Sequence, residues 1–185
     1  MTLTTFAPPA ALTSPRLVLE PLRAEHADEM APVLADPQLH TFIGGEPATP
    51  DQLRTRYSHQ AVGHSTDNTQ LWFNWILRRE DEQAVGTVQA TVTESPRGLS
   101  AEVAWVIGSA FQRRGYAREA AQAMVAWLRE HGVGEVTAHI HPEHEASAAV
   151  ARAIGLTPTE TVVDGEVRWQ NRADPATRGA GATAT

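Results

Sequence analysis

The chain has 185 residues, of which 42% are hydrophobic, and this length and composition fit one globular domain with a sizeable core. With 15 basic and 22 acidic residues the net charge is −7, which argues against nucleic acid as a partner and would attract cationic ligands, although solubility alone explains such a charge. The chain has no cysteine, which excludes disulfides and thiolate metal sites, and no apolar run approaches the ~20 residues that span a bilayer, so we expect a cytoplasmic protein without a membrane partner.

The chain begins with a segment rich in Thr, Ala and Pro that lacks the basic and apolar regions of a signal peptide. We interpret residues 1–14 as a flexible lead-in and expect the folded domain at residues 15–171. Apolar and polar residues alternate over Arg16–Pro21, which predicts a strand. Helical patterns follow over Ala24–Ala35 and from Pro50 toward Val62.

Three strands are predicted in the middle of the chain. The segments LWFNWIL at Leu71–Leu77, AVGTVQATV at Ala84–Val92 and AEVAWVI at Ala101–Ile107 are rich in β-branched and aromatic residues. Turns with the sequences REDEQ and ESPRG separate them, at residues 79–83 and 94–98.

The segment QRRGYA, residues 112–117, joins the third of these strands to an amphipathic helix whose apolar residues recur on one face from Ala117 to His131. Gly115 permits close approach of the backbone, and the first amides of a helix lack internal partners at the positive end of its dipole. A pyrophosphate fits such a site without a metal ion. The GxGxxG and GxxxxGK[ST] patterns are absent, which argues against dinucleotide-binding and P-loop folds. A simple strand–helix turn is the alternative.

Beyond this helix the sequence predicts a strand at Glu135–Ile140, a helix at Glu145–Ile154 and a closing hairpin of Thr157–Val163 and Glu166–Trp169. Residues 172–185 are small and polar, and we expect a disordered tail. The element order β-α-α-β-β-β-α-β-α-β-β predicts an α/β (α+β) fold with helices packed on a mixed sheet.

QRRGYA resembles the Gln/Arg-x-x-Gly-x-Gly/Ala signature of the GNAT superfamily of N-acetyltransferases, and it lies where that superfamily carries it. HEASAAVARAIGL, from His144, resembles the N-x-x-S stretch of the branch that contains the ribosomal-protein N-terminal acetyltransferases. The resemblance covers residues 16–169 and implies a mostly antiparallel sheet of about seven strands, splayed after the fourth strand and flanked by about four helices. It also implies acetyl-CoA as cosubstrate, a primary amine as acceptor and no metal.

The resemblance assigns a cofactor site. The pantetheine arm is expected along the main chain of Trp105, Val106 and Ile107, and His144 takes the position of the family asparagine near the cofactor. The pyrophosphate is expected at Gln112, Arg113, Arg114, Gly115, Tyr116 and Ala117.

Two residues are candidates for catalysis. Glu102 occupies a position that many GNAT enzymes use for a general base, usually acting through water, and a solvated or substrate-orienting carboxylate is the alternative. Ser147 matches the serine proposed as the acid in the N-x-x-S branch, and a serine that caps the helix is the alternative. The tyrosine acid of many relatives would fall on Ala151, which excludes a tyrosine acid at this position.

Other functions stay open on the sequence. His139, His141 and His144 would be a zinc cluster in a metal-dependent sensor, a weak pattern without cysteine. His144 and Ala151 also motivate a module that binds CoA or an acyl-CoA without turnover. The stretch Phe42–Gly45 falls where the family forms its acceptor pocket, but as sequence it is only a hydrophobic turn. The acceptor, whether a protein N-terminus or a small molecule, and a homodimeric state are not decided.

Overall fold

The structure is a computed structural model that describes residues 3, 6 and 9–171. The tail expected at residues 172–185, and residues 1, 2, 4, 5, 7 and 8 of the expected lead-in, lie outside the described residues. Within the described part, eight strands form one sheet in the order β1-β2-β3-β4-β5-β6-β8-β7. The strands are β1 (Leu12–Thr13), β2 (Leu17–Pro21), β3 (Gln70–Arg79), β4 (Ala84–Ser95), β5 (Gly98–Ile107), β6 (Val133–Ile140), β7 (Leu156–Val163) and β8 (Glu166–Asn171).

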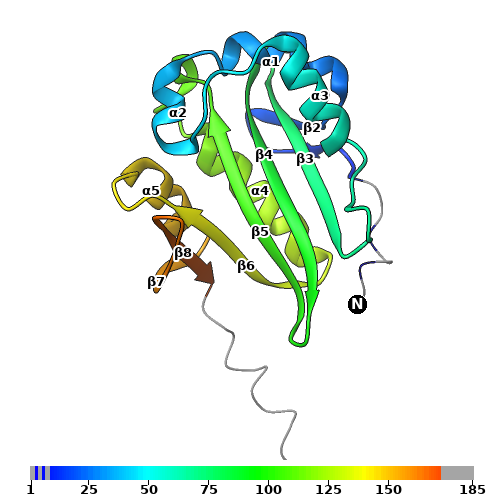
Figure 1. Ribbon diagram of the computed structural model, residues 1–185, viewed down its shortest axis with the longest axis vertical. Helices are drawn as coiled ribbons and strands as arrows, with labels where there is room; N and C mark the ends of the chain where they lie inside the picture. Colours follow the sequence, from blue (N-terminus) through cyan, green and yellow to red (C-terminus); the bar gives the residue numbers. More distant parts are fainter. Residues whose placement is uncertain (1–2, 4–5, 7–8, 172–185) are drawn as a thin grey trace, which may run out of the picture.

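The helices divide between the two faces of this sheet. They are α1 (Ala27–Val33), α2 (Pro37–Ile43), α3 (Pro50–Gln60), α4 (Tyr116–Glu130) and α5 (Glu145–Ala153), with 3₁₀ turns η2 (Ala24–His26) and η3 (Ser109–Phe111). Helices α1, α2 and α3 lie together across one end of the sheet, whereas α4 runs behind the long central strands (Figure 1). Helix α5 packs beside α4, against β6 and β7.

The expected mixed and mostly antiparallel sheet is confirmed, with one strand and one helix more than predicted in the described residues. The extra strand, β1, has only two residues, and it pairs with β2 inside the segment expected to be a flexible lead-in. The extra helix, α2, begins where Asp36 and Pro37 had indicated only the end of a helix. The Asp36 carboxylate accepts a hydrogen bond of 2.9 Å from the amide of Gln38, and a proline is well suited to the first helical position.

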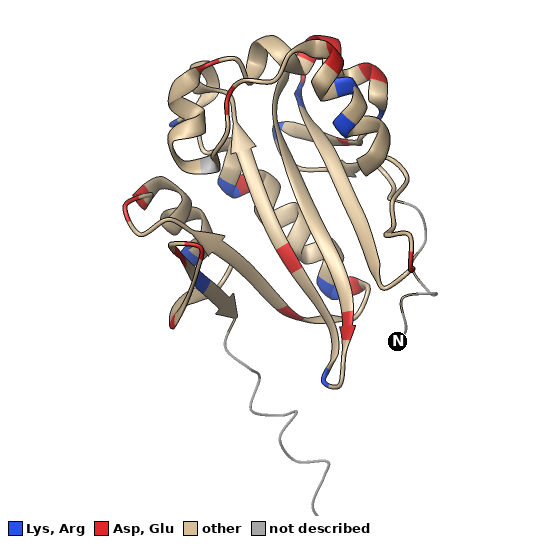
Figure 2. Cartoon of the chain, in the orientation of Figure 1, with Lys and Arg blue, Asp and Glu red and all other residues tan. Residues whose placement is uncertain are grey.

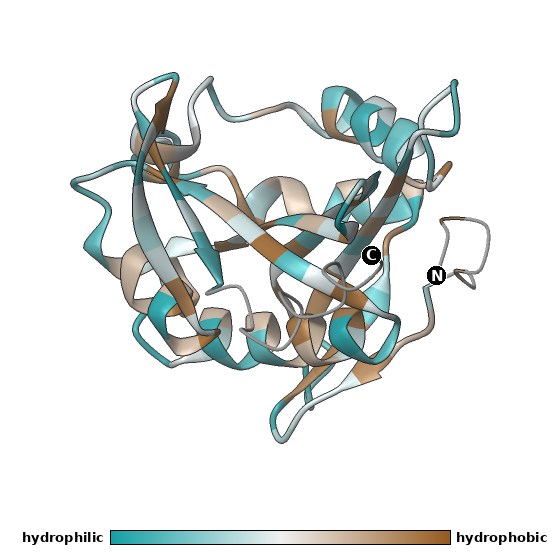
Figure 3. Cartoon of the chain, turned by 90° about the horizontal axis from the view of Figure 1, so that it is seen from below, coloured by the Kyte–Doolittle hydropathy of each residue, from teal (hydrophilic) through white to brown (hydrophobic). Residues whose placement is uncertain are grey.

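Charged residues gather on the helices and loops, and the central strands carry few of them (Figure 2). Hydrophobic residues are frequent on the strands, while the outward surfaces of the helices are largely hydrophilic (Figure 3). Among the described residues, no helix combines the length and the apolar character needed to cross a membrane.

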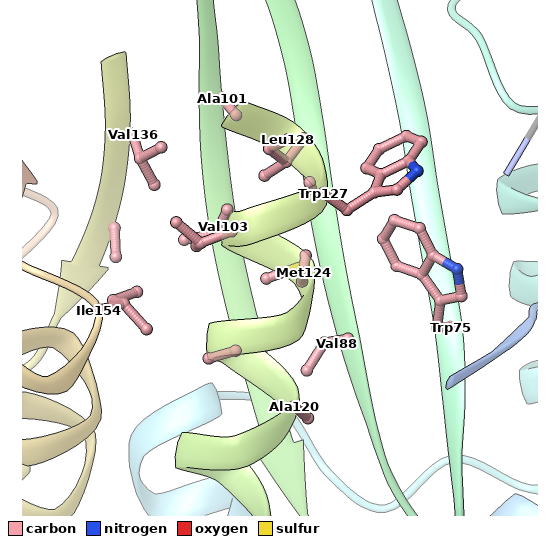
Figure 4. Close-up of a cluster of buried hydrophobic side chains, with 14 of the residues drawn as sticks. Trp75, Val88, Ala101, Val103, Ala120, Met124, Trp127, Leu128, Val136 and Ile154 are labelled. Carbon is pink, nitrogen blue, oxygen red and sulfur yellow. The ribbon is translucent and has the colours of Figure 1, made fainter. Parts of the chain in front are cut away.

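The main core lies between α4 and the sheet (Figure 4). Met124 and Leu128 of α4 are fully buried against it, and Ala120 lets the helix lie close to the strands. The indole rings of Trp75 and Trp127 pack edge to face with 5.4 Å between their centroids, an arrangement that aromatic pairs prefer. A second, smaller cluster packs α1 and α3 on the opposite face of the sheet. The two clusters hold the central strands from both sides.

Strands β5 and β6 separate halfway along their length. Their parallel pairing runs from Leu99–Val133 to Glu102–Thr137 and ends there. Past this point β6 pairs only with β8, and residues 103–107 of β5 pair only with β4. The expected splay after the fourth predicted strand is therefore confirmed, and it leaves one edge of β5 without a partner strand (Figure 1).

Candidate active site

The unpaired edge of β5 presents main-chain hydrogen-bonding groups. The amide of Gly108 donates to the carbonyl of Val85 at 2.9 Å, which fixes the alternation of the antiparallel ladder between β4 and β5. On this alternation the main chains of Val103, Trp105 and Ile107 face away from β4, toward the gap. The main chain of Val106 faces β4 instead. Trp105 and Ile107 therefore keep the geometry expected for pantetheine binding, and Val106 does not share it.

The side chains of this stretch alternate between two faces. Val103 and Ile107 are buried in the core under α4, and Trp105 packs against the same core. Glu102 and Ala104 are exposed on the opposite face, where Val106 borders a pocket beneath α3. The stretch thus separates a gap at its edge from a pocket on its face.

Trp105 reaches across the gap to α5. Its indole Nε1 donates a hydrogen bond of 3.2 Å to the Oγ of Ser147. Within the described residues, the hydroxyl of Ser147 takes part only in this hydrogen bond from Trp105, so the alternative of a capping serine has no support in this geometry. Because an indole is only a donor, Ser147 accepts this bond and its own proton stays available for a group in the gap.

The loop at residues 112–117, where the pyrophosphate is expected, leads directly into the N-terminus of α4. Gly115 precedes the first residue of the helix at φ +82°, Arg113 has φ +61°, and no side chain caps this helix end. Left-handed residues in such a turn direct successive N–H groups toward a common point. The side chains of Arg113 and Arg114 are exposed, and Ala117 is half-buried.

Two of the predicted loop residues contribute differently from their neighbours. The side chain of Tyr116 is buried under α4, so only its main chain faces the loop. The side-chain amide of Gln112 donates to the carbonyl of Ile107 at 3.1 Å and ties the loop to the open edge of β5.

An ion pair that the sequence analysis did not identify holds this loop in place. The guanidinium of Arg16 bonds to the carboxylate of Glu119 at 2.6 Å and to the carbonyl of Arg114 at 2.9 Å. Ser14 donates to the same carboxylate at 2.7 Å. Burial would raise the pKa of Glu119, but the hydrogen bonds from Ser14 and Arg16 outweigh it and hold that pKa below its usual value. The only sequence signal for this contact was that Glu119 is an acidic residue in the first turn of the predicted helix.

Glu102 lies at the point where β5 and β6 separate. Its side chain is 60% exposed, and its Oε1 lies 3.2 Å from the Nδ1 of His139 on β6. The pair therefore bridges the two strands on the face opposite α4, where solvent has access to the carboxylate.

His144 is packed against α2. Its ring stacks on Phe42, 4.2 Å between centroids, and the ring of His141 lies 5.5 Å from the same phenyl ring. Burial lowers the pKa of His144, and His141 lowers it further, against a weaker opposing effect of Glu166, so the imidazole is uncharged near neutral pH. Phe42 of α2, in the stretch that the sequence showed only as a turn, thus contacts the residue that directly precedes α5.

The histidines do not assemble into a metal centre. His139 is engaged with Glu102, whereas His144 faces Phe42. In the part of the chain that the structure describes, no group of three His, Cys, Asp or Glu side chains is arranged to hold a metal ion. The geometry gives the zinc alternative no support.

Comparisons with known proteins agree with this architecture. The model of the acetyltransferase (GNAT) domain matches residues 16–157. Among solved structures, RimL, a ribosomal L7/L12 α-N-protein acetyltransferase in complex with CoA, is 15% identical with a TM-score of 0.73, over 88% of this chain and 97% of that one. The spermidine N-acetyltransferase of Vibrio cholerae, in complex with CoA and spermine, is 16% identical with a TM-score of 0.66, over 83% and 94%. At this identity the likeness shows the fold alone. No curated protein sequence is significantly similar to the chain.

We predict that the Glu119–Arg16 contact stabilises the fold in a pH-dependent way. Glu119→Gln should lower the free energy of unfolding at pH 7 by about 1–2 kcal/mol, because a buried acceptor loses charge while Arg16 stays partly screened by solvent. The folded-state pKa of Glu119 is depressed, so this contribution is complete above the unfolded-state pKa of about 4.3 and is lost as the pH falls below it. Urea denaturation at pH 7 and at a series of pH values from about 4.5 down to about 2.5, below the unfolded-state pKa, measures the difference and its loss.

Glu130→Gln is the matched control, since Glu130 is an exposed residue of the same helix. Equal stability of the two variants at pH 7 would show that the contact does not stabilise the protein.

Proposed function

The chain belongs to the GNAT acetyltransferase family, because the model of that domain matches most of it, and we propose that it transfers an acetyl group from acetyl-CoA to a primary amine in a ternary complex. The observation that carries the proposal is the uncapped start of α4 beside the open edge of β5. The start of α4 would bind the pyrophosphate, and the open edge of β5 would bind the amide groups of the pantetheine arm. Arg113 and Arg114 would add charge-assisted contacts to phosphate oxygens.

Bound there, acetyl-CoA supplies an activated acyl thioester. The outward amide of Ile107 or Trp105 is suited to donate to the thioester carbonyl oxygen, where negative charge grows during attack by the amine. The stacked rings of Phe42 and His144, next to the start of α5, would limit the access of water to the bound thioester. These contributions come from main chain and packing, and they require no metal.

The transfer is tested by the release of free CoA from acetyl-CoA with a panel of amines. The wild-type protein should release CoA in an amine-dependent manner. Gly115→Glu should weaken CoA binding at least tenfold in calorimetry, because a charged side chain at φ +82° strains the loop and repels phosphate. Tight CoA binding without turnover on any amine would favour the alternative of a non-catalytic CoA-binding module. Unchanged CoA affinity in a folded Gly115→Glu variant would show that the loop is not the phosphate site.

We assign the role of general base to Glu102. Its exposed carboxylate lies three positions before Trp105, about 10 Å along the strand, so proton transfer to it would pass through water. Glu102→Gln should lower kcat by ~10²–10⁴ and leave CoA affinity near normal. Stopped-time CoA release and calorimetry on the same preparation measure the two quantities, and a fully active variant would reduce Glu102 to a surface residue.

Ser147 is proposed to donate a hydrogen bond to the leaving sulfur. An ordinary thiol has a pKa of about 8.5, so its thiolate is a tolerable leaving group near neutral pH and the contribution should be modest. Ser147→Ala should lower kcat about tenfold, the scale of one hydrogen bond, and spare CoA binding. Trp105→Phe, which removes the Nε1 donor that holds Ser147, should give a similar loss. Thermal melts serve as the folding control. A loss above a thousandfold for Ser147→Ala would indicate full acid catalysis, and no loss would assign Ser147 to packing alone.

A further inference from the structure

The pocket on the face of the sheet opposite α4 has an unusual lining for an enzyme that acts on amines. It has a volume of about 140 Å³ and is bordered by α3, the central strands and the end of β5. A cavity of about 150 Å³ holds benzene, so this pocket accommodates a group of similar size. Polar side chains line it, among them Arg56, Tyr57, Asn74 and Gln89, and no aspartate or glutamate of the described residues does.

The side chain of Tyr57 borders this pocket, and its buried hydroxyl has no hydrogen-bond partner in the described residues. The side chain is only 4% exposed, and its hydroxyl is one of two buried side-chain polar atoms without a hydrogen bond in the described residues. Burial raises the pKa of Tyr57 to about 12, so the phenol keeps its proton and is a donor. Leaving such a donor unpaired is costly, and a ligand oxygen that reaches it from the pocket would remove that cost.

Arg56 adds an unpaired positive charge at the rim. It is exposed, and within the described residues no carboxylate lies within ion-pair distance of its guanidinium. Arg54 on the same helix differs, because it pairs with Asp28 at 2.5 Å and with Asp51 at 3.1 Å. A free guanidinium is suited to bind a carboxylate through two parallel hydrogen bonds.

The pocket also lies in the right place for an acceptor. Val106 borders it, and the residues on either side of Val106 turn their main chains to the gap. An amine directed from the pocket toward the open edge of β5 therefore leaves its far end beneath α3. A second positive charge on that end would meet Arg56 and no counter-charge, and burial of an unpaired cation is costly.

We propose that the acceptor is a small amine that also carries a carboxylate, such as an amino acid. The carboxylate meets Arg56 at the rim, and the hydroxyl of Tyr57 donates to an oxygen of the same molecule. This inference rests on the acyl transfer proposed above, and it excludes polyamines as preferred acceptors.

The test compares acceptors that differ only in the carboxylate. Each amino acid in the panel is compared with three relatives: its carboxamide, its decarboxylated amine, and a short peptide that has this amino acid at its N-terminus. Spermidine is tested as a further acceptor. Release of CoA from acetyl-CoA should show kcat/KM at least tenfold higher for the amino acids than for the matched decarboxylated amines. Equal or faster turnover of decarboxylated amines or spermidine overturns the proposal, and a preference for peptides overturns it in favour of a protein N-terminus.

Two variants test the residues. Arg56→Gln should lower kcat/KM for the amino acids about tenfold and leave the decarboxylated amines unchanged, whereas the control Arg54→Gln should leave both unchanged. Tyr57→Phe should raise KM about fivefold for amino acids. Its free form should be at least as stable as the wild type, because the lost hydroxyl was unpaired. Equal losses for all acceptors in Arg56→Gln would contradict the assignment.

A binding measurement separates this inference from the proposed reaction. In the presence of CoA, amino acids should raise the melting temperature of the wild-type protein, and of Arg54→Gln, more than the decarboxylated amines do, and Arg56→Gln should abolish the difference. If no amine supports CoA release, the proposed reaction is wrong. The shifts in melting temperature then still show whether the pocket binds the carboxylate of an amino acid. Equal shifts for the two ligand series would overturn it.

Discussion

The end of the parallel pairing at Glu102 and Thr137 is the constraint on which the site depends. Beyond it, β6 follows β8, and α4 and α5 cover the face behind the gap. One edge of β5 is left without a partner strand in a largely buried position. Unpaired main-chain groups are costly there unless a ligand, water or side chain satisfies them. The side-chain amide of Gln112 already donates a hydrogen bond to the carbonyl of Ile107. A ligand rich in amide groups can satisfy the others, and for this reason we propose the break in the sheet as its binding surface.

Much of the fold was predictable because it follows from local period. The apolar face of α4 recurs every third or fourth residue, and the central strands are apolar segments between short turns, so these elements needed no long-range information. Helix α2 was missed because Pro37 both stops one helix and starts the next, and only the Asp36 cap separates the two meanings. Strand β1 was missed because two residues carry no measurable period, and it exists only through pairing with Leu19 and Val18.

The site divides in the same way. The left-handed turn at Gly115 is a property of a few consecutive residues, and the sequence predicts it directly. The Arg16–Glu119 contact joins residues 103 positions apart, and the bond from Trp105 to Ser147 spans 42 positions. Neither follows from spacing, because both depend on how α4 and α5 pack on the sheet. Tyr57 was invisible for a related reason. Its spacing from Leu53 predicts a buried helix position, but only the packed structure shows that its hydroxyl has no partner.

Net charge and local charge lead to opposite expectations for the acceptor, and the local charge decides. A net charge of −7 attracts cations at long range, but salt screens exposed charges beyond about 8 Å at physiological ionic strength. Near the pocket, Glu29 and Glu20 share the guanidinium of Arg78. Glu20 also pairs with Arg23, so two positive charges balance the two carboxylates. Arg56 keeps its charge without such a pair. An acceptor that has reached the pocket therefore meets a positive rim and neutral donors, whatever the sign of the surface that it crossed. The acidic surface maintains solubility and affects the encounter, while Arg56 and Tyr57 set which molecule stays.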